Sequence, residues 1–145
     1  LWNIYVHADF VTFPSLYEGF GNAFLEAIYF KKPLMVNRYA TFISDIEPKG
    51  FDLVTMDASL TAETVQTVRE ILESPRRAAE MVDHNYEIAR QHFSYCVLND
   101  QLDAVMAQAL GRERVAHRAV VCQTGPDAND LTIRPRVVQF ANLKN

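Results

Sequence analysis

The first 60 residues alternate short apolar runs with one amphipathic segment. The run "FVTFP" at residues 10–14 is β-branched and aromatic, and "LMVN" at residues 34–37 is equally apolar, so both predict short buried strands. Between them "NAFLEAIYFKK" predicts a helix of about ten residues that begins near Asn22 and ends before Pro33. A strand, a helix and a strand at this spacing predict the βαβ unit of a parallel sheet.

The pattern then becomes mostly helical. A short helical turn is expected at residues 42–47 and a third strand at residues 51–56. Three helices follow, from about residue 61 to 73, from 75 to 92, and from Ser94 to Gly111. Their expected packing faces repeat apolar residues at helical spacing: Val65, Val68 and Leu72, then Ala78, Val82, Tyr86 and Ala89, then Leu98, Leu102, Val105 and Ala109. We therefore expect an α/β fold with a parallel sheet and several packing helices.

The composition of the 145 residues, with 49% hydrophobic and 22% charged side chains, is that of one packed globular domain. A formal net charge of −4 argues against nucleic acid as the main partner, because phosphate binding normally requires a basic surface. The charge is uneven, since residues 1–110 hold 8 basic and 15 acidic side chains and residues 111–145 hold 6 and 3. We therefore expect residues 1–110 to form the domain and residues 111–145 to be a basic tail, a linker or an extra strand of unknown role.

Cysteine and histidine usage gives no sign of a metal site. Cys96 and Cys122 lack metal-ligand spacing. We expect two free thiols in a reducing compartment, and a single disulfide stays open as the less favoured alternative. No apolar run is long enough to span a bilayer, and the start has no signal-peptide pattern. The expected location is the cytoplasm, and binding of the basic tail to the inner membrane face stays an open alternative. The chain opens without methionine in an expected helix end, so we expect a fragment of a longer protein.

The segment "YEGFGNAFLEA" carries the candidate chemistry. In the expected fold, residues 15–21 form the loop at the carboxyl end of the first strand, where open parallel sheets bind ligands. Gly19 and Gly21 permit positive φ and close approach of the backbone. We therefore expect the amides of Gly19, Phe20, Gly21 and Asn22 to point into this crevice beside the positive end of the helix, which suits an anion or a sugar rich in hydroxyls.

Two glutamates, Glu18 and Glu26, flank the glycines and the start of the helix. Glu26 shares a narrow polar stripe of the helix with Asn22 and Tyr29, so its carboxylate can face the crevice. A carboxylate accepts two hydrogen bonds side by side, which matches the vicinal hydroxyls of a ribose, and Glu18 can accept from a second ring. Alternatively Glu26 is a solvated side chain stabilised by the helix dipole, and the spacing alone favours neither interpretation.

The stretch "ADFVTFPSLYEGFGNAFLEAIYFKKPLMVN" resembles the donor-site segment of retaining glycosyltransferases with the GT-B fold, in particular glycosyltransferase family four. The resemblance continues through "GFDLVTM" and "ILESPRRAAEMVDHNYEIARQHFSY" and covers residues 1–110. It implies part of a nucleotide-sugar-binding, Rossmann-like domain, the carboxyl-terminal domain of a GT-B enzyme. It also implies transfer of a sugar from a nucleoside diphosphate sugar to an acceptor with retention of anomeric configuration, without an obligatory metal or other cofactor.

Carried over by position, the resemblance gives each candidate residue a role. Glu18, the candidate catalytic residue, would contact hydroxyls of the donor sugar, and Glu26 would hold the ribose. The amides of residues 19–22 would lie against the donor sugar and its phosphates. A positioning role is expected of Glu18 more than a nucleophilic one.

Several parts of such an enzyme are missing from this sequence. The basic residues that neutralise the diphosphate, the segment that reads the base and the amino-terminal domain that receives the acceptor would all lie upstream. Lys31 and Lys32 replace the usual small residue before Pro33, and Arg38 is expected to be a surface arginine more than an anion contact. We therefore expect the chain alone to be inactive and to expose a sheet edge, through which it could associate with itself or with its missing half.

Two other classes of function stay open. A nucleotide-sugar binding or regulatory module without catalysis would keep the same loop. A sugar phosphorylase of the same architecture would use phosphate in place of the nucleoside diphosphate. The presence of Glu18, Gly19, Gly21 and Glu26 together favours the glycosyltransferase, whose acceptor, a sugar, a lipid or a small molecule, is not defined by the sequence.

Overall fold

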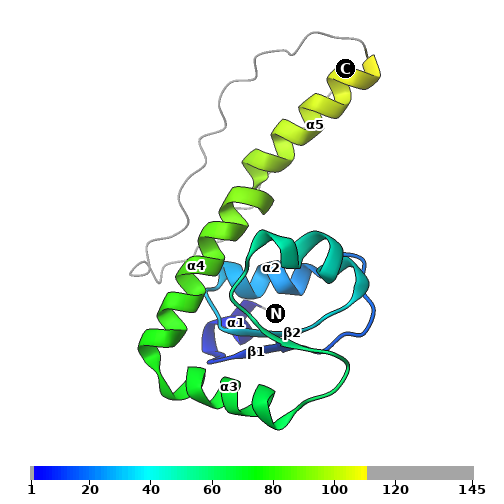
Figure 1. Ribbon diagram of the computed structural model, residues 1–145. Helices are drawn as coiled ribbons and strands as arrows, with labels where there is room; N and C mark the ends of the chain where they lie inside the picture. Colours follow the sequence, from blue (N-terminus) through cyan, green and yellow to red (C-terminus); the bar gives the residue numbers. More distant parts are fainter. Residues whose placement is uncertain (1, 111–145) are drawn as a thin grey trace. The chain divides into compact units, whose positions relative to one another are not determined.

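The computed structural model describes residues 2–110 of the chain (Figure 1). The chain divides into two compact units, residues 1–102 and residues 103–145. The elements of the first unit that carry the fold are α1 (Trp2–His7), β1 (Val11–Phe13), α2 (Asn22–Tyr29), β2 (Leu34–Asn37), β3 (Val54–Met56), α3 (Ala62–Glu73) and α4 (Pro75–Phe93). The expected basic tail lies outside the described residues, so its role and the domain boundary at residue 110 stay predictions.

A three-stranded parallel sheet with the order β1-β2-β3 forms the centre of this unit. α2 connects β1 to β2, so the expected βαβ unit is confirmed. The first and third strands are shorter than the apolar runs that predicted them. For β3 the reason is visible at Asp52, whose backbone amide and carbonyl bond to the side chain of Asn85 at 2.8 and 2.7 Å and not to a strand. Together the sheet and its helices make a Rossmann-like α/β arrangement.

The central strand, β2, is buried on both faces of the sheet. Leu34 and Val36 belong to one core cluster, with Phe24 of α2, whereas Met35 belongs to a second cluster with Ile71 of α3. Alternate residues of a strand point to opposite faces, so one four-residue strand joins both clusters. Figure 1 accordingly shows α2 and α3 on opposite sides of the strands.

α3 packs with a face that differs from the expected one. Thr64 and Ile71 are its buried residues, whereas the predicted Val65 and Leu72 are 47% and 51% exposed. The side chain of Thr61 accepts a hydrogen bond from the amide of Thr64 at 3.1 Å, which caps the helix. The third residue of the expected face, Val68, does pack against the second core cluster. The apolar stripe therefore predicted the helix correctly and its buried face in part, since that face contains Thr64, Val68 and Ile71.

α4 also buries a polar residue that the apolar pattern did not predict. Met81 and Asn85 are its buried residues, and the side chain of Ser74 accepts from the amide of Arg77 at the start of the helix. Asn85 is satisfied by the backbone of Asp52, so its burial leaves no unpaired polar group. The side chain of Arg77 adds a bidentate ion pair to Asp52, at 2.6 and 2.7 Å. The start of β3 is therefore fixed to α4 by polar contacts.

The segment after β2 also winds into helix. A π-helix at Phe42–Ile46 passes directly into a 3₁₀-helix at Glu47–Lys49, where a turn was expected at residues 42–47. Phe42 and Ile46 are buried in the first core cluster. Gly50, with φ of 84°, ends this segment in the left-handed region, which glycine adopts without strain.

The helix that follows Ser94, α5 (Tyr95–Leu110), has no buried residue. Its expected packing face is therefore not covered by the residues that the structure describes. Cys96, in its first turn, is disulfide-bonded, so the expectation of a free thiol is wrong at this position and the alternative of a disulfide holds there. Cys122 lies outside the described residues.

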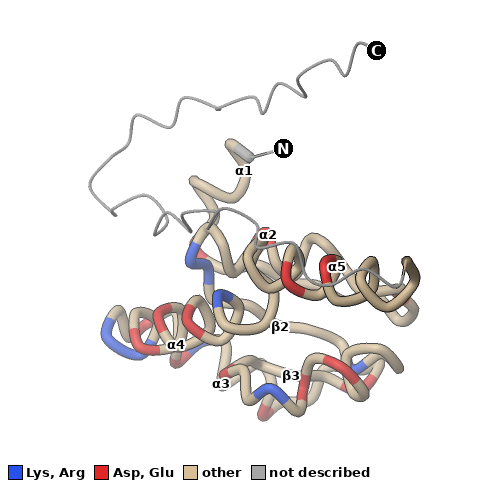
Figure 2. The backbone as a smooth tube through the Cα atoms, turned by 90° about the horizontal axis from the view of Figure 1, so that it is seen from above, with Lys and Arg blue, Asp and Glu red and all other residues tan. Residues whose placement is uncertain are grey.

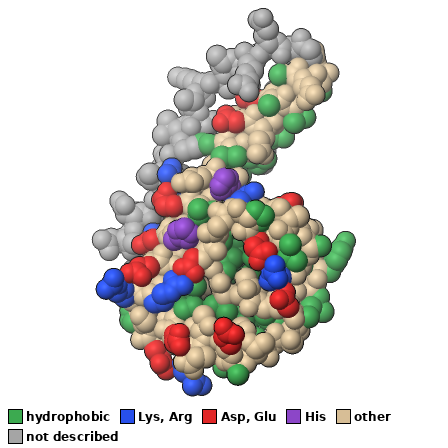
Figure 3. All heavy atoms as spheres, in the orientation of Figure 1, with side chains coloured by type: hydrophobic (Ala, Val, Ile, Leu, Met, Phe, Trp, Pro, Cys, Tyr) green, Lys and Arg blue, Asp and Glu red, His purple; other side chains and the backbone are tan. Residues whose placement is uncertain are grey.

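Charged side chains are mixed on the described surface. Lys and Arg are interspersed with Asp and Glu along the helices (Figure 2), and the face seen in Figure 3 shows both signs side by side. Ion pairs join several of them, among them Lys31 with Asp83 at 2.8 Å. Between residues 2 and 110, none of the helices combines the length and the apolar character that crossing a membrane requires.

Candidate functional site

The predicted loop lies between β1, which ends at Phe13, and α2, which begins at Asn22. The strands are parallel, so this loop and the residues after β2 and β3 meet at the same edge of the sheet, the edge formed by the carboxyl ends of the strands. Open parallel sheets bind their ligands outside this edge. The candidate residues are therefore placed where the sequence predicted them.

Gly19 and Gly21 have different structural roles. Gly21 is the N-cap of α2 with φ of 89° and ψ of 72°, and a Cβ atom there would come within 2.9 Å of the ring of Phe13 and of the hydroxyl of Tyr39. Gly19 has no positive φ, and a Cβ atom there would meet nothing within 4 Å. The expected positive φ is confirmed for Gly21 and wrong for Gly19. Gly19 has open space where a Cβ atom would lie, and its backbone conformation is one that other residues can adopt.

Three side chains, one at the end of β2 and two just after it, hold the backbone of this loop. The amide nitrogen Nδ2 of Asn37 donates to the carbonyl of Ser15 at 3.1 Å. The hydroxyl of Tyr39 donates to the carbonyl of Phe20 at 2.6 Å, and the hydroxyl of Thr41 donates to the carbonyl of Glu18 at 3.4 Å. The sequence reasoning missed these residues. A signal was present, because polar amide and hydroxyl groups stand at every second position from the last residue of a buried strand onward.

The amides of the loop are left available. Within residues 2–110, no backbone or side-chain acceptor bonds to the amides of Gly19, Phe20 or Gly21. A strong backbone donor that is not paired inside the protein bonds to water or to a ligand. Because the same loop precedes the positive end of α2, an oxygen-rich anion can be bound here by several donors at once.

Glu18 has a fixed backbone and an available side chain. Its carbonyl accepts from Thr41, whereas its carboxylate forms no hydrogen bond or ion pair with the described side chains. The carboxylate lies close to Tyr39: burial raises the pKa of the Tyr39 phenol, and the negative charge of Glu18 raises it further. Tyr39 is therefore a neutral hydrogen-bond donor over the whole physiological pH range.

Glu26 is arranged in the opposite way. Its carboxylate lies close to the phenol of Tyr5 on α1; burial raises the pKa of Tyr5, and the interaction with Glu26 raises it further. Tyr5 is itself fixed, because it is buried and its ring stacks on Phe30 with centroids 5.4 Å apart. Glu26 is thus a half-buried carboxylate beside a buried phenol, and Tyr5 is another residue that the sequence reasoning missed.

The last two candidates, Phe20 and Asn22, differ in exposure. The ring of Phe20 contacts Phe93 of α4 at a centroid distance of 5.2 Å, so its side chain packs against the protein and only its backbone faces the crevice. Asn22 is exposed and does not cap α2 with its side chain. Between Leu1 and Leu110, the described part contains no group of three or more His, Cys, Asp or Glu that could hold a metal ion.

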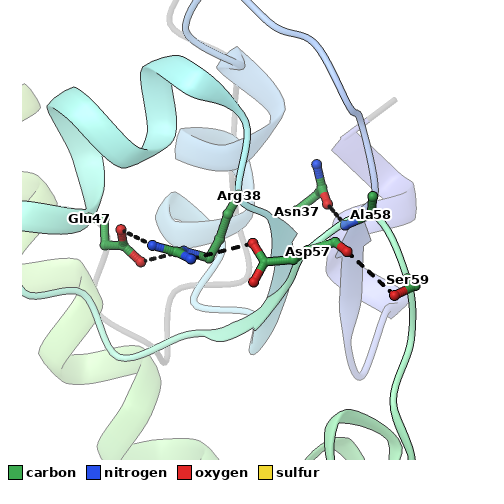
Figure 4. Close-up of polar contacts among 6 residues, drawn as sticks. All are labelled: Asn37, Arg38, Glu47, Asp57, Ala58 and Ser59. Carbon is green, nitrogen blue, oxygen red and sulfur yellow. Dashed lines mark hydrogen bonds and ion pairs between the residues drawn. The ribbon is translucent and has the colours of Figure 1, made fainter.

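Arg38 is occupied by acidic partners at the same edge of the sheet (Figure 4). Its Nε and Nη2 atoms bond to the two oxygens of Glu47 at 2.8 and 2.9 Å, and Nη1 lies 3.4 Å from Asp57. A bidentate pair holds the guanidinium plane in one orientation. Arg38 is therefore committed to a partly exposed salt bridge, in agreement with the surface arginine that was expected there.

A comparison with protein families agrees with this geometry. The family model described as "Glycosyl transferases group 1" matches residues 1–88. The chain belongs to this family. The match includes the loop, both glutamates and all three strands, and it confirms the resemblance to GT-B glycosyltransferases.

Curated proteins similar to the chain include two that are named mannosylglucosylglycerate synthase. The protein from Thermotoga maritima is 39% identical over 114 residues, which are 70% of this chain and 27% of that protein. The protein from Petrotoga mobilis is 46% identical over 63 residues, 43% of this chain and 15% of that protein. This chain therefore spans only about a quarter or less of the length of these relatives. No solved structure matches the chain.

Proposed function

We propose that this chain is the donor-binding part of a retaining glycosyltransferase that transfers a sugar from a nucleoside diphosphate sugar to an acceptor. The observation that carries the proposal is the loop at residues 15–21, whose available amides lie beside the start of α2 and the carboxylate of Glu18. Donors fixed in advance stabilise negative charge without rearranging during the reaction. The departing diphosphate is such a charge.

Each glutamate has a separate task in this proposal. Glu18 accepts hydrogen bonds from hydroxyls of the donor sugar, because its carboxylate has no partner among the described side chains. Glu26, whose carboxylate lies beside Tyr5, accepts hydrogen bonds from the ribose hydroxyls with lone pairs of its two oxygens. The reaction needs no obligatory metal in this proposal, and the leaving diphosphate is stabilised by amides and by basic residues of the preceding part of the enzyme.

The names of the relatives suggest which substrates to test first. Mannosylglucosylglycerate contains mannosyl, glucosyl and glycerate groups, so a nucleoside diphosphate mannose and glucosylglycerate are a reasonable first donor and acceptor. The matched region of this chain includes the candidate donor site, so the similarity supports the choice of donor more directly than the choice of acceptor.

The test uses the full-length protein that contains this chain. Mannose and glucose donors with uridine, guanosine and adenosine diphosphates are offered with glucosylglycerate, and the product anomer is identified by NMR. We expect one donor to be consumed only when acceptor is present, with its anomeric configuration retained. An inverted product would refute retention, and donor binding without transfer to any acceptor would favour the non-catalytic module.

A second arm of the experiment tests the site. Glu26→Ala should mainly raise the donor KM and Glu18→Ala should mainly lower kcat, each by about 10- to 100-fold, because a charge-assisted hydrogen bond contributes about 1.5–3 kcal/mol. Glu70→Ala is a matched control, since Glu70 lies on the exposed face of α3 and bonds only to the neighbouring Gln66. Wild-type kinetics in both site variants would exclude this assignment.

A further inference from the structure

The loop at residues 15–21 does not hold its own conformation. The residues that fix it come from the end of β2 and the segment after it, and the shortest of these contacts joins the hydroxyl of Tyr39 to the carbonyl of Phe20 at 2.6 Å. We propose that Tyr39 is a positioning residue of the candidate donor site, which holds the Phe20 carbonyl inward so that the Gly21 amide faces the ligand. This inference rests on the proposed function, which supplies the identity of the ligand as a nucleoside diphosphate sugar.

The direction of the amide follows from peptide geometry. In a planar trans peptide, the carbonyl of one residue and the amide of the next point in opposite directions. The chain has no cis peptide among the described residues, so the Phe20 carbonyl that points to Tyr39 turns the Gly21 amide away from it. Thr41 acts in the same way two residues earlier in the loop. Its hydroxyl bonds to the Glu18 carbonyl and so turns the Gly19 amide outward.

The position of Tyr39 is set by the core. Its side chain is 2% exposed, and its ring makes an edge contact with Phe13 of β1 at 6.1 Å and a tilted contact with Phe42 at 5.9 Å. The hydroxyl lies 2.9 Å from the point where a Cβ atom of residue 21 would be, so Gly21 and Tyr39 fit only as a pair. A buried ring that is held by both the sheet and the π-helix is therefore a rigid support for the loop.

The hydroxyl of Tyr39 donates its proton to a backbone carbonyl of the loop. Burial and the nearby charge of Glu18 raise the pKa of its phenol, which keeps the hydroxyl protonated and able to donate. A protonated phenol that is buried without an acceptor would be costly, so the bond to Phe20 is retained in the folded state. Tyr39 lies close to both the Glu18 carboxylate and Gly21. A site for a sugar phosphate requires such a carboxylate and an amide near one another.

The experiment compares Tyr39→Phe with Tyr29→Phe in the full-length protein. Both changes remove one phenolic hydroxyl, but Tyr29 is 50% exposed and contacts only the ring of Phe30 in the described structure. The readouts are the KM and kcat for GDP-mannose and UDP-glucose with glucosylglycerate, the Kd for each donor, and the rate of chymotrypsin cleavage within residues 15–22. A thermal melt of each variant separates loss of positioning from loss of folding.

We expect Tyr39→Phe to raise the Kd and KM of the donor by about tenfold with a smaller change in kcat, since one oriented amide is lost from binding. Cleavage within residues 15–22 should become faster, while Tyr29→Phe stays at wild-type values in every readout. Thr41→Val should have a weaker effect of the same kind, and Thr41→Ser, which keeps the hydroxyl, should restore wild-type binding.

Two outcomes overturn the inference. Unchanged donor binding in Tyr39→Phe, with wild-type protein that does bind the donor, refutes the positioning role and leaves the proposed function intact. Unchanged cleavage within residues 15–22 in Tyr39→Phe refutes it as well, even where no donor binds. Faster cleavage together with no donor binding by the wild-type protein shows that the proposed function has failed while Tyr39 does fix the loop.

Discussion

Glu18 and Glu26 differ in the part of the residue that the protein holds. The backbone of Glu18 is fixed by Thr41 while its carboxylate has no hydrogen-bonding partner among the described residues. The carboxylate of Glu26, in contrast, lies beside the phenol of the buried Tyr5 and raises its pKa. Two glutamates of one motif are therefore supported in opposite ways.

The difference has a physical consequence for each position. A carboxylate without protein partners can bind or release a substrate hydroxyl at no cost to the fold. A carboxylate that is half-buried beside a phenol interacts with the fold itself, and removing it changes the surroundings of that phenol. Substitutions at Glu18 should therefore change function alone, whereas substitutions at Glu26 should change function and stability together.

The largest effect is expected at Gly21, in the loop that carries Glu18. Gly21→Ala forces a Cβ atom into contact with Phe13 and Tyr39 at a φ of 89°, so we expect a loss of about 2–4 kcal/mol in the free energy of unfolding. Gly19→Ala is the matched control, because its Cβ atom meets nothing within 4 Å. Chemical denaturation measures both variants, and equal stability of the two would contradict the role assigned to Gly21.

The second comparison is between the isosteric variants Glu18→Gln and Glu26→Gln. Glu18→Gln should lower kcat by about 100-fold, because the charge that binds the donor sugar is lost at the reacting end. Glu26→Gln should raise the donor KM by about tenfold with a smaller change in kcat, because the ribose is remote from the reaction. Steady-state kinetics of the full-length protein separate the two, and a reversed pattern would exchange the assigned roles.

The stability of the two alanine variants tests the comparison directly. Glu26→Ala removes the half-buried carboxylate beside the buried phenol of Tyr5, so we expect a loss of about 1–3 kcal/mol, whereas Glu18→Ala should stay within about 0.5 kcal/mol of the wild type. Urea unfolding measures both. Adding Tyr5→Phe to Glu26→Ala should recover part of the loss, and a double-mutant cycle with no coupling would show that the interaction between the two side chains does not stabilise the protein.

A third carboxylate, Glu47, can be compared with Glu18 and Glu26. Its expected effect, on acid stability, is the smallest of those predicted. The hydrogen bond from Arg38 lowers the pKa of Glu47 below its ordinary value of 4.5. A folded pKa below the unfolded one stabilises the protein above the unfolded value, and this stabilisation is lost as the pH falls through the folded pKa. Because the pair is partly exposed, Arg38→Met should reduce acid stability only slightly.

The measurement is an acid titration of Arg38→Met below pH 5, followed by circular dichroism. The control is Arg90→Met, whose ion pair with Glu87 at 2.9 Å is more exposed. We expect the unfolding midpoint of Arg38→Met to lie at a slightly higher pH than that of the wild type, and the midpoint of Arg90→Met to stay unchanged. Added salt should reduce the difference.

The sequence by itself determined the order of strands and helices, the parallel βαβ unit and the place of the loop. These features depend on local patterns: short apolar runs, the cap at Ser74 and glycine at the start of α2. Local patterns also predicted the family, because the loop, Glu18 and Glu26 lie within one continuous stretch of chain.

Only the tertiary structure decided which groups hold that stretch in place. Tyr39 and Thr41 reach the loop from beyond β2, and Tyr5 reaches Glu26 from the helix before β1. The buried face of α3 and the burial of Asn85 were likewise settled by neighbours distant in sequence. A linear pattern shows the period of an element, whereas the partner of each side chain depends on which elements the sheet brings together in space.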